Sequence, residues 1–127
     1  MRSMFPRFKS FVHAFHGLRY GLATQRNLRF HFLAACLVLV LARAFRITES
    51  EFWMLSLAVI LVIAAELFNT AVELAVDLAM PNQHPKAKAA KDVAATAVLL
   101  TAVFAVVTGW IVFDGYILEW WESVRAH

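Results

Sequence analysis

Three apolar stretches, each long enough to cross a lipid bilayer, constrain this chain more than any other feature. They cover about residues 28–45, 52–80 and 88–116, and a transmembrane helix needs about 20 apolar residues. The composition agrees, because 61% of the residues are hydrophobic and the mean hydropathy is +0.66, whereas apolar residues make up about half of a soluble domain. We predict an all-α integral membrane protein, with three transmembrane helices in a single domain over residues 1–127.

The segment of about residues 5–24 that precedes the first span has a different pattern. Its apolar residues recur at roughly helical spacing, and basic residues and histidines occupy much of the remainder. This pattern predicts an amphipathic helix on the membrane surface. Gly17 and Gly21 form a GxxxG pair, which would permit close packing of this helix against another.

Short polar connections separate the three spans. In the first connection, Thr48 or Ser50 is suited to cap the second span, with Glu51 in its first turn. Pro81 and Pro85 end the second span and lead into a polar connection before the third.

The distribution of basic residues predicts the topology. The net charge is +3, but Lys and Arg border the apolar stretches and form no aromatic-interleaved stripe, so we predict no nucleic-acid partner. Most of them lie in the N-terminal segment and the second connection. We therefore predict a multi-pass protein whose N-terminus is cytoplasmic.

The second span carries a row of polar residues near its end. Glu66, Glu73 and Asp77 fall within a narrow arc of one helix face, and Asn69 lies beside them. An ionisable group at membrane depth costs several kcal/mol unless it is paired, hydrated or metal-bound, so such a row is a functional-site hypothesis. The topology puts it in the cytoplasmic half of the span, on the same side as Lys91 and Asp92.

These residue types suit phosphoryl transfer to a lipid. Carboxylates are hard ligands for Mg²⁺, and the transfer needs a metal, a cation near the phosphates and a base for the attacking hydroxyl. We assign these roles to Glu73, Lys91 and Glu66 respectively, because Glu66 lies deepest and nearest a lipid alcohol. Two other interpretations are a charged helix that holds subunits together and a proton relay, but polarity stops near Glu66. His31 is interpreted as a hydrogen-bonded boundary residue.

The residues also carry a family resemblance. The run from Glu66 to Asp77, followed by the run from His84 to Ala95, resembles the signature of the prokaryotic diacylglycerol kinase family. The segments 69–71 (Asn-Thr-Ala) and 91–95 (Lys-Asp-Val-Ala-Ala) are more similar to its undecaprenol kinase branch than to its diacylglycerol branch.

The resemblance implies an ATP-dependent lipid kinase of the bacterial inner membrane, with Mg²⁺ as cofactor and its active site on the cytoplasmic side. It further implies a homotrimer with active sites shared between neighbours. The lipid acceptor is expected to be undecaprenol, with diacylglycerol as the alternative. A non-catalytic or proton-relay membrane subunit is the alternative from another class.

Carried over by position, Glu66 matches the family's catalytic base and Glu73 a metal-binding carboxylate. The residues matching those around ATP are Asn69, Asp77, His84, Lys91 and Asp92. One position departs from the family pattern, because Gln25 stands where a glutamate usually helps to bind metal. An amide oxygen can still bind Mg²⁺, but the lost negative charge weakens its hold on the ion.

Overall fold

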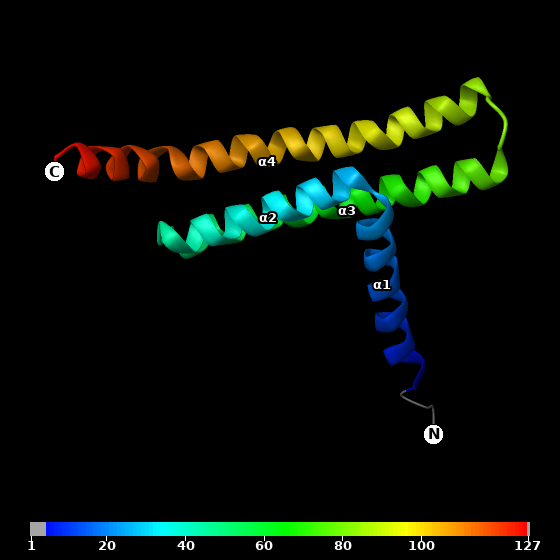
Figure 1. Ribbon diagram of the computed structural model, residues 1–127, viewed down its shortest axis with the longest axis horizontal. Coiled ribbons are helices and arrows are strands. Elements are labelled where there is room, and N and C mark those ends of the chain that lie inside the picture. The colour runs from blue at the N-terminus through cyan, green and yellow to red at the C-terminus, as the bar shows by residue number, and fades with distance from the viewer. Residues whose placement is uncertain (1–4, 127) are drawn as a thin grey trace.

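The computed structural model describes residues 5–126, which form four helices and no strand (Figure 1). These are α1 (Phe5–Thr24), α2 (Arg26–Ala44), α3 (Glu49–Ala79) and α4 (Pro85–Arg125). The predicted all-α class is confirmed. Helices α2, α3 and α4 are each long and apolar enough to cross a membrane, and α1 covers the segment predicted to lie on its surface.

Helix α3 is the centre of the packing. Helices α2 and α4 lie alongside it, whereas α1 leaves the start of α2 at a steep angle (Figure 1). Ala42 of α2, Leu55 of α3 and Val112 of α4 form a buried cluster near the α2–α3 turn. The three long helices are therefore joined by small and branched side chains, which allow close approach.

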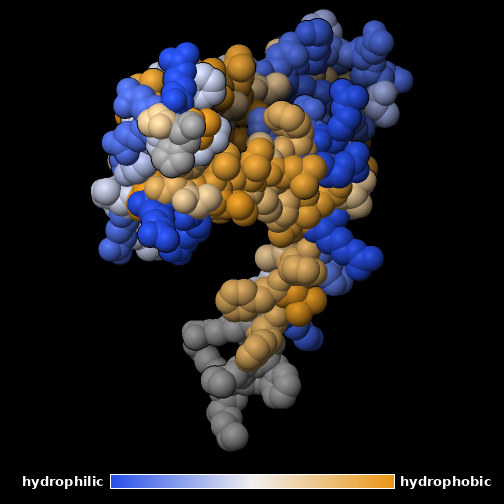
Figure 2. Space-filling model, turned by 60° about the vertical axis from the view of Figure 1, so that its left-hand side comes forward, coloured by the Kyte–Doolittle hydropathy of each residue, from blue (hydrophilic) through white to orange (hydrophobic). Residues whose placement is uncertain are grey.

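Most large apolar side chains of α2, α3 and α4 face outward. In the view of Figure 2 they form an apolar belt, with polar residues gathered at the two ends of the bundle. Such a surface suits lipid, where helices can satisfy all their backbone hydrogen bonds internally. On α1, the side chains of Phe8, Phe11 and Phe15 are also exposed, as expected of a helix that lies on a membrane.

The α2–α3 turn is closed by a capping box. The Thr48 hydroxyl accepts a hydrogen bond from the Glu51 amide at 3.4 Å, and the Glu51 carboxylate accepts one from the Thr48 amide at 2.9 Å. Of the two predicted caps, Thr48 is therefore the one used. The Tyr116 hydroxyl also donates to Glu51, at 2.8 Å, which fixes α4 to the start of α3.

At the other end of the bundle, α3 ends just before Pro81 and α4 begins at Pro85. His84 caps α4, because its Nδ1 accepts a hydrogen bond from the Lys86 amide at 3.1 Å. Proline suits the first helical position, where its missing N–H would have no partner. Helix α4 then continues past the predicted limit of residue 116 and ends at Arg125.

The junction of α1 and α2 is a tight elbow at Gln25. The Arg29 guanidinium donates to the carbonyls of Leu22 and Ala23, at 3.2 and 3.1 Å, and so satisfies the end of α1. A Cβ on Gly21 would lie 2.7 Å from Leu28 and 3.2 Å from Leu67, whereas one on Gly17 would meet nothing within 4 Å. Only Gly21 of the predicted pair thus makes a close helix contact.

Candidate active site

The predicted row of polar residues lies along one continuous helix, and its burial changes along its length. Glu66 is buried, with 3% of the residue exposed, and Thr70 on the next turn is also buried. Asn69 and Glu73 are half-buried, and Asp77 at the end of the row is exposed. The row therefore leads from the interior of the bundle to the open α3–α4 connection.

Glu66 is paired with a residue of another helix. Nε2 of His31 on α2 lies 3.4 Å from Oε1 of Glu66. Within residues 5–126, His31 is the one polar side chain paired with this carboxylate. The sequence did not place His31 in the site, although it shares a helix face with Ala35, Val38 and Ala42, and Ala42 packs on α3. The signal that could have predicted this contact is the polar side chain of His31 on the helix face that packs against α3.

Asn69 and Glu73 form the middle of the row. Asn69 Nδ2 donates a hydrogen bond to Glu73 Oε1 at 3.1 Å. Asn69 Oδ1 is buried and has no hydrogen-bond partner within the described part of the chain. A buried oxygen without a partner calls for a water or a cation, so this turn offers amide and carboxylate oxygens of the kind that Mg²⁺ prefers.

Gln25 lies at the N-cap of α2, where its side chain makes no capping hydrogen bond. The antiparallel register of α2 and α3 is fixed by His31 opposite Glu66 and Ala42 in contact with Leu55. Extending this register along α2 brings Gln25 level with the turn of α3 that carries Glu73. By this register, Gln25 and Glu73, the two predicted metal ligands, lie at a similar depth.

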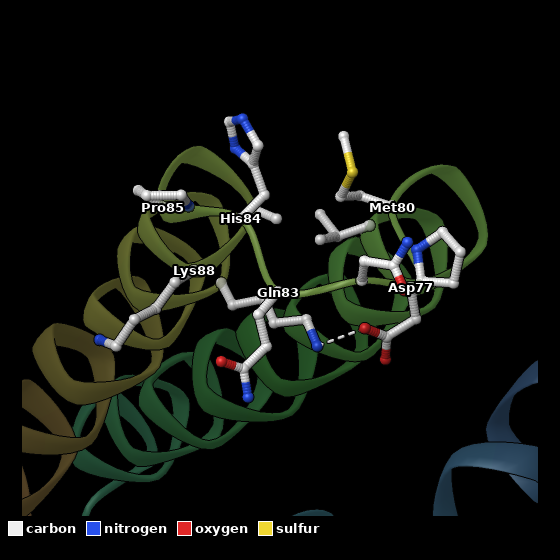
Figure 3. Close-up of a pocket in the computed structure, with 11 residues that line it drawn as sticks. Asp77, Met80, Gln83, His84, Pro85 and Lys88 are labelled. Atoms are coloured by element: carbon white, nitrogen blue, oxygen red, sulfur yellow. Dashed lines mark hydrogen bonds and ion pairs between the residues drawn. The ribbon is translucent and has the colours of Figure 1, made fainter.

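Asp77 and Lys91 form an ion pair between α3 and α4, shown by the dashed line in Figure 3. Both line an open pocket of about 720 Å³ at the α3–α4 connection, together with His84 and Lys88. Asp92 does not line this pocket. It pairs instead with Lys88, at 2.6 Å. Asp92 points away from the pocket because adjacent residues of a helix, such as Lys91 and Asp92, point about 100° apart. In Figure 3 the Lys88 side chain extends away from Asp77.

An apolar groove of about 340 Å³ runs between α2, α3 and α4. Its walls are alanine, valine, leucine and phenylalanine side chains, with Gly109, and His31 is its one titratable residue. Because His31 also contacts Glu66, the groove reaches the buried end of the polar row. A hydrocarbon chain in this groove could therefore present a polar head to Glu66.

Within residues 5–126, no group of three His, Cys, Asp or Glu side chains is placed to hold a metal ion. A cation here would therefore take its remaining ligands from amide oxygens, water or a bound phosphate. Mg²⁺ commonly binds in that way, through one or two carboxylates and the phosphates of a substrate.

The fold and the polar row define a helical membrane protein with an acidic site on its central span. Residues 12–113 match the family described as prokaryotic diacylglycerol kinase. The chain belongs to the prokaryotic diacylglycerol kinase family and is a membrane lipid kinase. The predicted family and enzyme class are thus confirmed.

Several named relatives resemble the chain over most of its length. Undecaprenol kinase of Bacillus subtilis (strain 168) is 42% identical over 106 residues, which cover 84% of this chain and 86% of the relative. Diacylglycerol kinase of Synechocystis sp. is 43% identical over 79% of this chain, a match that spans 58% of the relative. Diacylglycerol kinase of Helicobacter pylori (strain J99) is 33% identical over 76% of each chain.

Proposed function

We propose that this protein transfers the γ-phosphoryl group of ATP to the hydroxyl of undecaprenol. The observation that carries the proposal is the course of the polar row on α3. One end, at Glu66, is buried beside an apolar groove, and the other end, at Asp77 and Lys91, opens into a pocket. A lipid hydroxyl and a nucleotide phosphate can thus approach the same helix from opposite ends.

Undecaprenol is proposed as the acceptor on two grounds. The match to the undecaprenol kinase of Bacillus subtilis covers 86% of that relative, against 58% for the Synechocystis diacylglycerol kinase of similar identity. The segments 69–71 and 91–95 also resemble the undecaprenol kinase branch. Diacylglycerol is the second candidate, because the apolar groove selects for hydrocarbon and not for a particular chain.

In the proposed reaction Glu66 is the general base. The lipid oxygen attacks the γ-phosphorus, its proton passes to the Glu66 carboxylate, and the bond to the β,γ-bridging oxygen breaks to release ADP. Lys91 contacts the phosphates. Its pairing with Asp77 is partly exposed, and such pairs contribute only about 0–1 kcal/mol, so a phosphate can replace Asp77 at little cost.

We propose that Glu73, Asn69 and Gln25 hold Mg²⁺, which when bound offsets the charge that develops on the phosphates. The unpartnered Asn69 oxygen supports this assignment. Asn69 then also borders the phosphates, and Asp77 and His84 border the nucleotide from the pocket wall. Asp92 acts through Lys88, which it holds at the rim of the pocket.

We further propose a homotrimer in the bacterial inner membrane, with sites shared between neighbouring subunits and facing the cytoplasm. The exposed apolar faces of α2 and α4 support association, because they are available to other helices as well as to lipid. Native mass spectrometry of the detergent-solubilised protein should give three chains of 14.3 kDa. A single-chain mass under conditions that preserve activity would contradict the trimer.

The proposed function is tested by incubating purified protein with radiolabelled ATP, Mg²⁺ and either undecaprenol or diacylglycerol. We expect label in undecaprenol and at least tenfold less in diacylglycerol. Glu66→Gln should abolish transfer while leaving nucleotide binding largely intact, and Asp114→Asn, at an exposed carboxylate near the other end of α4, should leave transfer unchanged. Label in neither lipid would contradict the kinase function and favour a non-catalytic or proton-relay subunit.

A further inference from the structure

Glu66 is a buried carboxylate at membrane depth, and such a group is costly unless it has a partner. Along α3, residues 52–65 contain no charged or histidine side chain. Within the described chain the one polar side chain paired with Glu66 is that of His31, which is 23% exposed against 4% for Glu66. The imidazole of His31 is therefore the one polar partner that the described residues offer to this carboxylate.

His31 also lies between the apolar groove, where the lipid is proposed to bind, and the carboxylate of Glu66. Its ring lines the apolar groove, and Nε2 faces Oε1 of Glu66 at 3.4 Å. The ring of Phe30 stands edge-on to it, with centroids 5.5 Å apart. A molecule in the groove therefore lies beside the imidazole that faces Glu66.

We propose that His31 is a positioning residue for the acceptor side of the reaction. This inference depends on the proposed function. His31 holds Oε1 of Glu66 in place and leaves Oε2 for the incoming lipid hydroxyl. In the transfer step the hydroxyl proton moves to Glu66, the new O–P bond forms and ADP leaves, so His31 itself gains and loses no proton.

The proposed contact requires a hydrogen-bond donor at position 31, whereas a purely structural role would require only a side chain of similar size. Glutamine at position 31 can still direct an N–H group at Glu66, whereas leucine fills similar space without a donor. Alanine leaves a gap that opens onto the groove, and free imidazole can enter that gap. A misplaced reacting group can cost about a hundredfold in rate, so the three substitutions should differ in turnover more than in folding.

The experiment measures kcat and KM for His31→Gln, His31→Leu and His31→Ala in detergent micelles containing undecaprenol. We expect kcat to fall about ten- to a hundredfold in the Leu and Ala variants, with KM for ATP within twofold of wild type and most activity kept in the Gln variant. Added imidazole should restore part of the activity of His31→Ala but not of His31→Leu. His13→Gln, at an exposed histidine of α1, is the matched control and should behave as wild type.

The outcomes separate this inference from the proposed function. Wild-type protein that labels no lipid contradicts the proposed function itself. Active wild-type protein with His31→Leu within twofold of its kcat, or with equal losses in the Gln and Leu variants, overturns the role of His31 alone. If His31→Ala fails to fold, the comparison of the Gln and Leu variants decides the question in the same way.

Discussion

At the scale of single residues, Gln25 is the position where the family resemblance leads us to expect a glutamate. The residue is half-buried at the elbow between α1 and α2, and its side chain makes no capping bond. By the α2–α3 register it lies level with Glu73. A neutral amide at this depth leaves the proposed Mg²⁺ site with one carboxylate fewer than a glutamate at position 25 would provide.

Gln25→Glu should therefore increase the affinity for Mg²⁺. A carboxylate binds this ion better than an amide does because it adds a full negative charge. We expect the Mg²⁺ concentration for half-maximal activity to fall about three- to tenfold, which corresponds to a gain in binding free energy of up to about 1.4 kcal/mol. The measurement is the Mg²⁺ dependence of lipid phosphorylation at fixed ATP. Asn27→Asp adds the same charge at an exposed position of the same turn and should change this value less. An unchanged Mg²⁺ dependence in Gln25→Glu would remove Gln25 from the metal site.

At the scale of elements, the local signals of the sequence predict the helices well. The apolar stretches indicate α2, α3 and α4, and Thr48 with Glu51 predicts the start of α3 because a capping box involves residues only three apart. The single face of the polar row also follows from helical periodicity alone.

Contacts between helices were not predictable in the same way. His31 and Glu66 are far apart in the sequence, and their pairing depends on the α2–α3 register, which a single sequence does not define. Lys91 and Asp92 are adjacent in the sequence, yet they belong to two different ion pairs. Helix α4 continues past the predicted limit of residue 116 to Arg125, because residues 117–124 contain no proline or glycine.

The elbow between α1 and α2 should depend on Gly21. Alanine there would bring Cβ within 2.7 Å of Leu28, which is fully buried, and within 3.2 Å of Leu67. Overpacking of this kind costs about 1–3 kcal/mol, so Gly21→Ala should lower the thermal stability in detergent and expose the elbow to protease. Gly17→Ala, which meets nothing within 4 Å, should be neutral or slightly stabilising because alanine favours helices. Equal behaviour of the two variants would contradict the close contact at Gly21.

At the scale of the whole molecule, the two polar ends of the bundle differ in the number of basic residues that they carry. The end with the α3–α4 connection carries Lys86, Lys88 and Lys91, and it holds the pocket proposed for the nucleotide. The opposite end carries Arg43 and Arg46 beside the α2–α3 turn. The positive-inside rule and the location of cellular ATP both predict that the α3–α4 connection faces the cytoplasm. In the inverted orientation the proposed kinase would have no access to its phosphoryl donor.

This orientation can be measured with single cysteines in a Cys36→Ala background. Ser50→Cys, in the first turn of α3, and Gln83→Cys, in the α3–α4 connection, lie at opposite ends of the bundle. A membrane-impermeant maleimide should label Ser50→Cys in intact spheroplasts but label Gln83→Cys only after permeabilisation. The Cys36→Ala variant itself, which contains no cysteine, controls for non-specific labelling. The reverse pattern would invert the topology, and labelling of both from outside would contradict α3 as a membrane-spanning helix, because one span must separate the two positions.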